Sequence, residues 1–231
     1  MTTSPETTVL VGNDVVDLTA PRAADRHLDE RFVGRVFTEA ERARILAEDD
    51  PSLRLWLGWA AKEAAYKVVS KALGEPPPFA HRRFEVTWSG ANEGLVHYES
   101  NEVRILVQHA GAEGHVHVLA HMPRAIEGPA KVDRLDRAGA PWLAPLESLL
   151  ERFTELERAS VHSVSSAAVR IAARVDAAEL LGVEVGRVEI VCGPGALGRR
   201  PPRVLVDGTR ASVDVSLSHD GPWIAWALAP R

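Results

Sequence analysis

The chain has 231 residues, of which 45% are hydrophobic and 26% are charged, a composition typical of globular proteins with a sizeable core. Its formal net charge of −5 argues against a nucleic-acid-binding protein, which normally carries a basic excess. The single cysteine, Cys192, excludes an internal disulfide framework. No apolar run approaches the ~20 residues that cross a bilayer, and the N-terminus lacks a secretion signal. These features predict a cytoplasmic protein without membrane contact.

The first part of the chain predicts a short strand followed by helices and strands. Residues 9–11 form an apolar strand that ends at Gly12. Thr38 and Glu41 fit a capping box, which opens a helix. A longer helix is expected over residues 53–73, because apolar residues recur there at spacings of three and four and Gly74 with three prolines follows. Strands are then expected over residues 84–88, 103–107 and 115–121.

Residues 123–145 contain six prolines and glycines among charged residues, which is typical of an interdomain connection. An amphipathic helix is expected over residues 146–156, and the apolar stripe from Val164 to Ala178 predicts another. Four strands are expected after it, over residues 187–191, 203–206, 213–217 and 222–228.

Each half of the chain therefore predicts a helix packed on an antiparallel sheet. This is an α+β pattern of two similar halves related by a pseudo-twofold axis, with domains over residues 1–122 and 146–231 and a linker over 123–145. No repeat is expected at the level of residue identity, so the similarity between the halves is architectural.

The segment from Gly12 to Leu18 places two carboxylates, Asp14 and Asp17, after an apolar strand. Burying a charge is costly unless a positive group meets it, and Mg²⁺ prefers hard oxygen ligands such as carboxylates. These residues indicate a metal site. The alternative is a plain turn, since Asn and Asp both favour turns.

A second candidate group lies on the predicted long helix. Trp59, Glu63 and Lys67 are spaced four residues apart and share one side of the helix. Glu63 could complete a metal site, while Lys67, one turn further on, could neutralise a phosphate. The alternative is a solvated Glu–Lys ion pair, which the spacing alone favours.

The third candidate group is Ser216-Leu217-Ser218-His219 near the C-terminus. A Ser–His pair at a strand end can donate hydrogen bonds to a phosphate. The alternative is a hairpin in which His219 is incidental. Ser218 is not expected to be a nucleophile, because adjacent side chains on a strand point to opposite faces and no Gly-x-Ser-x-Gly elbow is present.

Other motifs carry less weight. Residues 193–198 match G-x-G-x-x-G, but arginines and prolines follow where a dinucleotide-binding motif would open a helix. No Walker-type G-x-x-x-x-G-K-[ST] segment is present, which excludes the ordinary kinases and NTPases. His115, His117 and His121 share one face of a strand, and a solvated face is expected there rather than a zinc site. Cys192 is expected in the core.

Together these segments resemble the 4′-phosphopantetheinyl transferase superfamily. The resemblance covers about residues 9–73 and 165–229. Its motifs are Gly12-Asn13-Asp14, the helix Trp59-x-x-Lys62-Glu63-x-x-x-Lys67, the loop Gly198-Arg199-Arg200-Pro201 and Ser216-Leu217-Ser218-His219. The resemblance implies transfer of the phosphopantetheine arm of coenzyme A to a serine of an acyl or peptidyl carrier protein. It also implies dependence on Mg²⁺ and release of 3′,5′-ADP.

The resemblance implies roles for individual residues. Asp14 and Glu63 would bind Mg²⁺, and the catalytic residues would be Glu63, which helps to deprotonate the acceptor serine, and Lys67. Contacts with coenzyme A would come from Lys62, Lys67, Arg170, Arg174, Arg200, Pro201, Ser218 and His219. Larger members often carry a second acid where this chain has Val16, whereas the short synthases carry it at the position of Asp17. Asp17 is therefore a third candidate metal ligand.

The order of the motifs differs from that of the larger transferases, in which the loop and Ser-x-Ser-His segments precede the other two. The resemblance thus implies a circular permutation and a monomeric enzyme with coenzyme A between its halves. It predicts that Asp14, Glu63 and Lys67 face His219 across one pocket. Two alternatives stay open: a catalytically silent module that binds coenzyme A or a carrier protein, and a divalent-metal phosphohydrolase. The hydrolase leaves the Ser-Leu-Ser-His segment unexplained.

Overall fold

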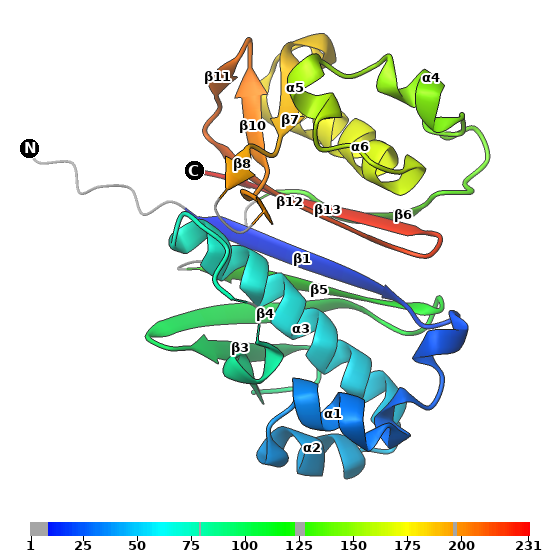
Figure 1. Ribbon diagram of the computed structural model, residues 1–231, viewed down its shortest axis with the longest axis vertical. Helices are drawn as coiled ribbons and strands as arrows, with labels where there is room; N and C mark the ends of the chain where they lie inside the picture. Colours follow the sequence, from blue (N-terminus) through cyan, green and yellow to red (C-terminus); the bar gives the residue numbers. More distant parts are fainter. Residues whose placement is uncertain (1–8, 79, 123–127, 196–197) are drawn as a thin grey trace, which may run out of the picture.

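The computed structural model describes residues 9–78, 80–122, 128–195 and 198–231. It contains two halves, each with a long helix on an antiparallel sheet, as predicted (Figure 1). In the first half the sheet has the order β1-β5-β4-β3-β2. Its strands are β1 (Leu10–Asp17), β2 (Glu85–Trp88), β3 (Glu93–Tyr98), β4 (Asn101–Ala110) and β5 (His115–Met122). Its helices are α1 (Glu30–Val36), α2 (Glu39–Leu46) and α3 (Pro51–Ala72), with 3₁₀ turns at Pro21–Ala23, Arg26–Leu28 and His81–Arg83.

The main sheet of the second half has the order β12-β13-β6, beside a smaller sheet β11-β10-β7 and a β8–β9 pair. These strands are β6 (Ala130–Arg134), β7 (Val188–Val191), β8 (Pro194–Gly195), β9 (Gly198–Arg199), β10 (Arg203–Val206), β11 (Thr209–Arg210), β12 (Val213–Asp220) and β13 (Trp223–Pro230). The helices are α4 (Leu146–Leu150), α5 (Glu155–Arg158) and α6 (Val164–Leu181), with a 3₁₀ turn at Val185–Arg187. No helix in the described part of the chain is long and apolar enough to span a membrane.

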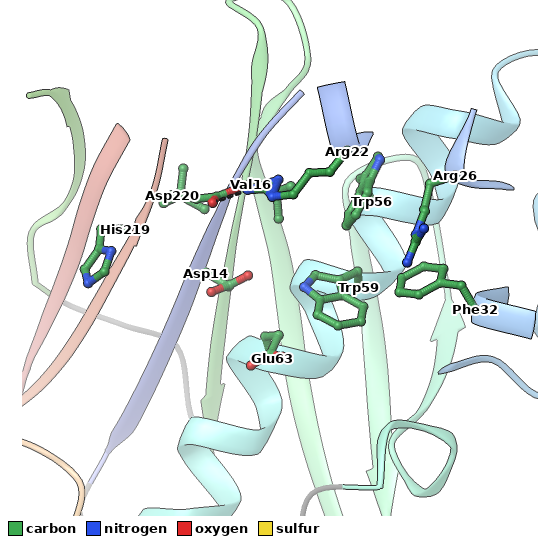
Figure 2. Close-up of a pocket in the computed structure, with 11 residues that line it drawn as sticks. Asp14, Val16, Arg22, Arg26, Phe32, Trp56, Trp59, Glu63, His219 and Asp220 are labelled. Atoms are coloured by element: carbon green, nitrogen blue, oxygen red, sulfur yellow. Dashed lines mark hydrogen bonds and ion pairs between the residues drawn. The ribbon is translucent and has the colours of Figure 1, made fainter. Parts of the chain in front are cut away.

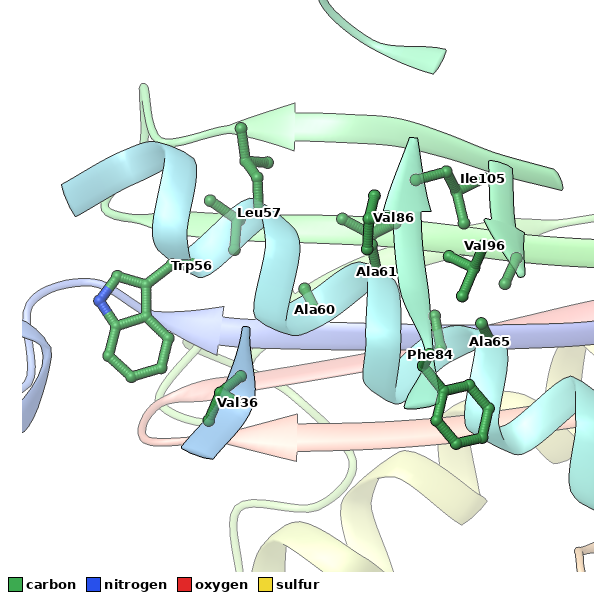
Figure 3. Close-up of a cluster of buried hydrophobic side chains, with 14 of the residues drawn as sticks. Val36, Trp56, Leu57, Ala60, Ala61, Ala65, Phe84, Val86, Val96 and Ile105 are labelled. Atoms are coloured by element: carbon green, nitrogen blue, oxygen red, sulfur yellow. The ribbon is translucent and has the colours of Figure 1, made fainter. Parts of the chain in front are cut away.

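Helix α3 positions the functional residues against β1. Its N-terminus is capped by Asp50, whose carboxylate accepts from the Leu53 amide at 2.9 Å. Its buried face packs on the first sheet to form the core of this half (Figure 3). A Cβ at Gly12 would lie 2.0 Å from the carbonyl oxygen of Ala64, so only glycine lets β1 approach the helix this closely.

The sequence predicts that the first strand ends at Gly12. In the structure, β1 continues to Asp17. The reason is pairing along both of its edges. One edge pairs with β5 in an antiparallel ladder that ends where Asp17 meets His115. Asp14 is therefore a mid-strand residue rather than a turn residue, which corrects the alternative of a plain turn.

The other edge of β1 is closed by side chains of β12 instead of a backbone ladder. Four alternate N–H groups donate at 2.8–3.2 Å: Val11 to Asp214, Asn13 to Ser216, Val15 to Ser218 and Asp17 to Asp220. We name this set of bonds the side-chain seam. Because an unpaired buried N–H group is costly, the seam both protects an edge strand and joins the two halves.

The expectation that the halves share no residue-level repeat is wrong. Residues 37–45 and 153–161 are identical at six of nine positions. Each segment forms a capping box, at Thr38 in the first half and at Thr154 in the second. The two halves thus share a local structure as well as an architecture.

The predicted connection over residues 123–145 holds more structure than expected. Residues 123–127 lie outside the described residues, but β6 falls within the range and pairs with β13. Trp142, 2% exposed, joins the core of the second half. The single helix expected over 146–156 is instead two short helices, because Thr154 caps a new one. Helix α1 and strand β3 are additions that the sequence did not predict.

Candidate active site

A pocket of about 400 Å³ opens where β1, α3 and the end of β12 meet. Asp14, Glu63 and His219 line it, one from each of these elements. Figure 2 shows Asp14 and Glu63 close together across the gap between β1 and α3, with His219 on the neighbouring strand. A second pocket of about 390 Å³ shares Asp14 and His219 with the first and adds Lys67. The sequence predicts that Asp14, Glu63, Lys67 and His219 meet across one pocket. The structure brings Asp14, Glu63 and His219 to the first pocket, and Lys67 lies in the second one with Asp14 and His219.

Asp14 is buried and has two partners. Its Oδ1 accepts from Lys67 Nζ at 3.0 Å and from the Ser218 hydroxyl at 2.8 Å. Burial raises the pKa of Asp14 to about 6; Glu63 acts in the same direction, while Lys67 and Ser218 oppose it. Asp14 and Glu63 therefore place two carboxyl groups in one pocket. Their carboxylate oxygens fit a hard divalent cation.

Lys67 and His219 provide groups that suit an anionic ligand. Lys67 Nζ also donates to the carbonyl of Asn13 at 2.6 Å, which holds the ammonium beside Asp14 at the edge of the second pocket. Burial, together with the positive charges of Lys67 and Arg170, lowers the pKa of His219. The imidazole is therefore neutral at pH 7 and can donate one hydrogen bond and accept another.

Ser218 is already engaged within the protein. Its hydroxyl accepts from the Val15 amide at 3.2 Å and donates to Asp14 at 2.8 Å. The serine therefore belongs to the side-chain seam and orients Asp14, although it also lines the second pocket.

The structure places Lys62 elsewhere than predicted. It is fully buried and donates to both carboxylate oxygens of Glu41, at 2.7 and 2.9 Å, and to the Phe84 carbonyl at 2.5 Å. Burial lowers the pKa of Lys62, and Glu41 opposes that shift. All three ammonium protons are in use and neither pocket is near, so Lys62 does not contact coenzyme A but anchors α3 to α2.

Asp17 also lies away from the pockets, on the face of β1 opposite Asp14, because residues three apart on a strand point to opposite sides. Its carboxylate accepts from the amide and the hydroxyl of Thr19, at 3.0 and 2.6 Å. The structure thus gives Asp17 a turn-forming position and does not bring it to the predicted metal site.

The structure separates the two predicted arginines of α6. Arg170 lines the second pocket, where its guanidinium donates to the carbonyl and hydroxyl of Ser166, at 2.9 and 2.7 Å. Arg174 lines neither pocket; it donates to the Arg152 carbonyl at 3.0 Å and lies 3.5 Å from Glu157. Arg170 remains a candidate for binding coenzyme A, whereas the guanidinium of Arg174 is held by groups within the protein.

The predicted Arg200-Pro201 loop borders the second pocket only through its next residue, Pro202. Arg200 is exposed, and its backbone N–H donates to the carbonyl of Gly193 at 2.9 Å. Contacts of Arg200 and Pro201 with coenzyme A stay predictions.

One wall of the first pocket was predicted from the sequence only at Trp59. It consists of two cations and three aromatic side chains: Arg22, Arg26, Phe32, Trp56 and Trp59. An ion pair from Arg22 to Asp220 joins this wall to the second half (Figure 2). The signal was present, because the two arginines are four residues apart and the two tryptophans three apart.

Comparisons with known proteins give the family of this chain. A family model described as the 4′-phosphopantetheinyl transferase superfamily matches residues 10–120. A holo-[acyl-carrier-protein] synthase of Shewanella denitrificans is 30% identical over 108 residues, which cover 47% of this chain and 84% of that protein. The chain belongs to the 4′-phosphopantetheinyl transferase superfamily. A further synthase of this superfamily, from Chlamydia muridarum, is 38% identical over 64 residues, 28% of this chain and 48% of that protein.

The solved structures that match this chain are less similar to it in sequence than the relatives named above. The crystal structure of the Thermotoga maritima holo-[acyl-carrier-protein] synthase aligns with a TM-score of 0.39 at 18% identity, covering 64% of this chain and 76% of that one.

Proposed function

We propose that this member of the superfamily transfers 4′-phosphopantetheine from coenzyme A to a serine of an apo acyl or peptidyl carrier protein. The observation that carries the proposal is the meeting of Asp14, Glu63 and His219 in one pocket, with Lys67 in the adjoining one. Superfamily membership and the relatives named holo-[acyl-carrier-protein] synthase support it.

Asp14 and Glu63 would hold Mg²⁺. The raised pKa of Asp14 supports this assignment, because a cation would favour the ionised carboxylate that burial and Glu63 disfavour. When bound, Mg²⁺ would neutralise charge on the pyrophosphate of coenzyme A.

The remaining groups suit a phosphoryl transfer that depends on positioning and charge neutralisation. Lys67 and Arg170 supply positive charge in the second pocket, and His219 lies between the two pockets. In the reaction, the serine Oγ forms a bond to the β-phosphorus and the bond to 3′,5′-ADP breaks. Glu63 accepts the hydroxyl proton.

Both halves of one chain contribute to the pocket, which supports a monomeric enzyme. A cytoplasmic location likewise stays a prediction, supported by the composition.

The test is incubation with coenzyme A, Mg²⁺ and an apo-carrier protein, followed by mass spectrometry of the carrier. We expect the carrier to gain the mass of one phosphopantetheine, and a chelator to prevent the gain. An unmodified carrier with bound coenzyme A would indicate a silent binding module. Breakdown of coenzyme A without transfer would indicate a hydrolase.

Lys67→Ala tests the phosphate role separately. The variant is expected to bind coenzyme A more weakly in a calorimetric titration while the protein still binds Mg²⁺. Unchanged coenzyme A affinity and an unchanged transfer rate would leave Lys67 as a partner of Asp14 alone.

A further inference from the structure

Three potential metal ligands gather at the turn between β4 and β5, outside both pockets described above. They are His109 near the end of β4, Glu113 in the turn and His115 at the start of β5. One ligand atom of each residue lies within 4.8 Å of the others.

The tight turn brings these side chains together. Gly111 and Gly114 have φ angles of 90° and 78°, a left-handed conformation that favours glycine. The Gly111 amide donates to the His115 carbonyl at 2.9 Å, which closes the turn. The rings of His109 and His115 consequently lie 4.8 Å apart, centre to centre.

The sequence predicts a solvated face for His115 and His117. In the structure both side chains are buried. This face of β5 packs against the second half, with the Trp223 ring centre 3.9 Å from that of His115. Neither ring nitrogen of His115 has a hydrogen-bond partner among the described residues. A buried polar atom without a partner calls for an explanation, such as a bound ion.

His117 shows how the same strand treats a histidine that does have a partner. Its Nε2 lies 3.2 Å from Nδ2 of Asn13. His115 has no such partner among the described residues, and one ligand atom each of His109 and Glu113 lies within 4.8 Å of a ring nitrogen of His115.

We propose that His109, Glu113 and His115 bind a divalent transition-metal ion of the zinc class, distinct from the magnesium pocket. Two imidazole nitrogens with one carboxylate oxygen suit Zn²⁺ or Co²⁺, whereas Mg²⁺ prefers oxygen ligands alone. Glu113 is exposed, and His109 lines a pocket of about 410 Å³ on the side of α6, so an ion has a route to the cluster.

The position of the cluster assigns the ion a structural role. The Leu18 amide donates to the Gly114 carbonyl at 2.9 Å, and His115 contacts Trp223 of the second half. A bound ion therefore fixes the turn at the point where β1, β5 and β13 meet.

The test is titration of the metal-free protein with Co²⁺, followed by its visible absorption, and in parallel with Zn²⁺ by calorimetry. With excess Mg²⁺ present to occupy the proposed magnesium pocket, we expect one Co²⁺ or Zn²⁺ site per chain and a rise in melting temperature on binding. His109→Ala and Glu113→Gln are each expected to weaken binding at least tenfold. Both residues lie at or beside an exposed turn, so these variants avoid the folding risk of changing His115.

Two controls separate this site from other binding. His97→Ala removes a histidine of β3 that lies 4.0 Å from Glu102, a His–Glu pair outside the cluster. Asp14→Asn disables the proposed magnesium pocket. Both variants are expected to bind Co²⁺ as the parent does. Equal affinity in His109→Ala and His97→Ala would overturn the proposal, as would loss of the site in Asp14→Asn.

Discussion

Each half contains a buried glutamate in a capping box, and the two glutamates differ in the distance to their cationic partner. In the first half, the capping-box residue Glu41 accepts from the Val86 amide at 2.8 Å and pairs with Lys62 at 2.7 Å. In the second half, Glu157 accepts from the Ile190 amide at 2.9 Å, but Arg174 lies 3.5 Å away. In both halves a buried glutamate thus joins a short helix to a strand, but its cation lies closer and donates to both of its carboxylate oxygens only in the first half.

The strands show a second correspondence. Residues 103–111 and 213–221 both place valine first, apolar residues at the third and fifth positions, histidine seventh and glycine ninth. His109 therefore matches His219. Both histidines line a pocket beside a long helix. The pocket of His219 contains Asp14 and Glu63, whereas that of His109 contains Lys131, Asp133 and Asp176.

The pairing registers explain this difference. Asp14 pairs with Val118, and Val118 pairs with Val107. In the second half Lys131 pairs with Trp226, and Trp226 pairs with Leu217, the residue that matches Val107. Lys131 thus stands where the other half has Asp14. The proposed chemistry depends on that acid and not on the shared architecture.

The sharpest test of this contrast is Glu63→Gln. The change removes the charge that would bind Mg²⁺ and accept the serine proton, so transfer is expected to fall by about 10²–10⁴-fold. Asp133→Asn, in the pocket of the second half, is the matched control and should keep the parental rate. Steady-state transfer assays compare the two variants, and equal rates would remove Glu63 from the catalytic site.

Stability should distinguish the two buried glutamate pairs. Lys62→Ala leaves Glu41 charged and buried, so we expect a loss of about 3–5 kcal/mol in the free energy of unfolding. Arg174→Ala should cost much less, because Arg174 lies 3.5 Å from Glu157, whereas Lys62 lies 2.7 Å from Glu41. Urea unfolding measures both losses. Similar losses would show that the cation matters equally in both halves.

The two buried acids at the junction should respond to pH with opposite signs. Burial raises the pKa of Asp14 from 3.8 to about 6, so its contribution to stability is present below pH 3.8 and lost as the pH rises through about 6. With a chelator present at pH 8, Asp14→Asn is therefore expected to raise the free energy of unfolding by about 1–3 kcal/mol. This increase should vanish toward pH 4.

Asp214 provides the opposite case. Burial opposes ionisation there, but Lys71 and Arg231 prevail and lower the pKa of Asp214. Its contribution is present above pH 3.8 and lost as the pH falls, so Asp214→Asn should destabilise the protein at pH 8. Urea unfolding from pH 4 to 8 checks both variants, and the same sign for the two would contradict this account.

The smallest expected effect concerns the side-chain seam. Ser216→Ala leaves the buried Asn13 amide without its acceptor, at a cost of about 1–2 kcal/mol in unfolding free energy. Because Ser216 does not contact Asp14, transfer should continue at the parental rate. Ser218→Ala should cost a similar amount but also slow transfer, since it releases Asp14. If both variants keep full activity, the seam does not orient the acid.

The sequence by itself predicted the parts of the molecule that depend on neighbouring residues. The capping box at Thr38 and the long helices α3 and α6 follow from local periodicity and end signals. The family resemblance also identified Asp14, Glu63, Lys67 and His219, which the fold brings together.

Only the tertiary structure decided which polar residues face a pocket and which are buried within the protein. Lys62 and Lys67 lie five residues apart on one helix, and the sequence treated both as ligands of coenzyme A. Glu41 and the Phe84 carbonyl, both distant in the chain, take up Lys62. Likewise, β1 extends past Gly12 because β5 and β12 pair with its two edges, and no pattern within β1 specifies those long-range partners.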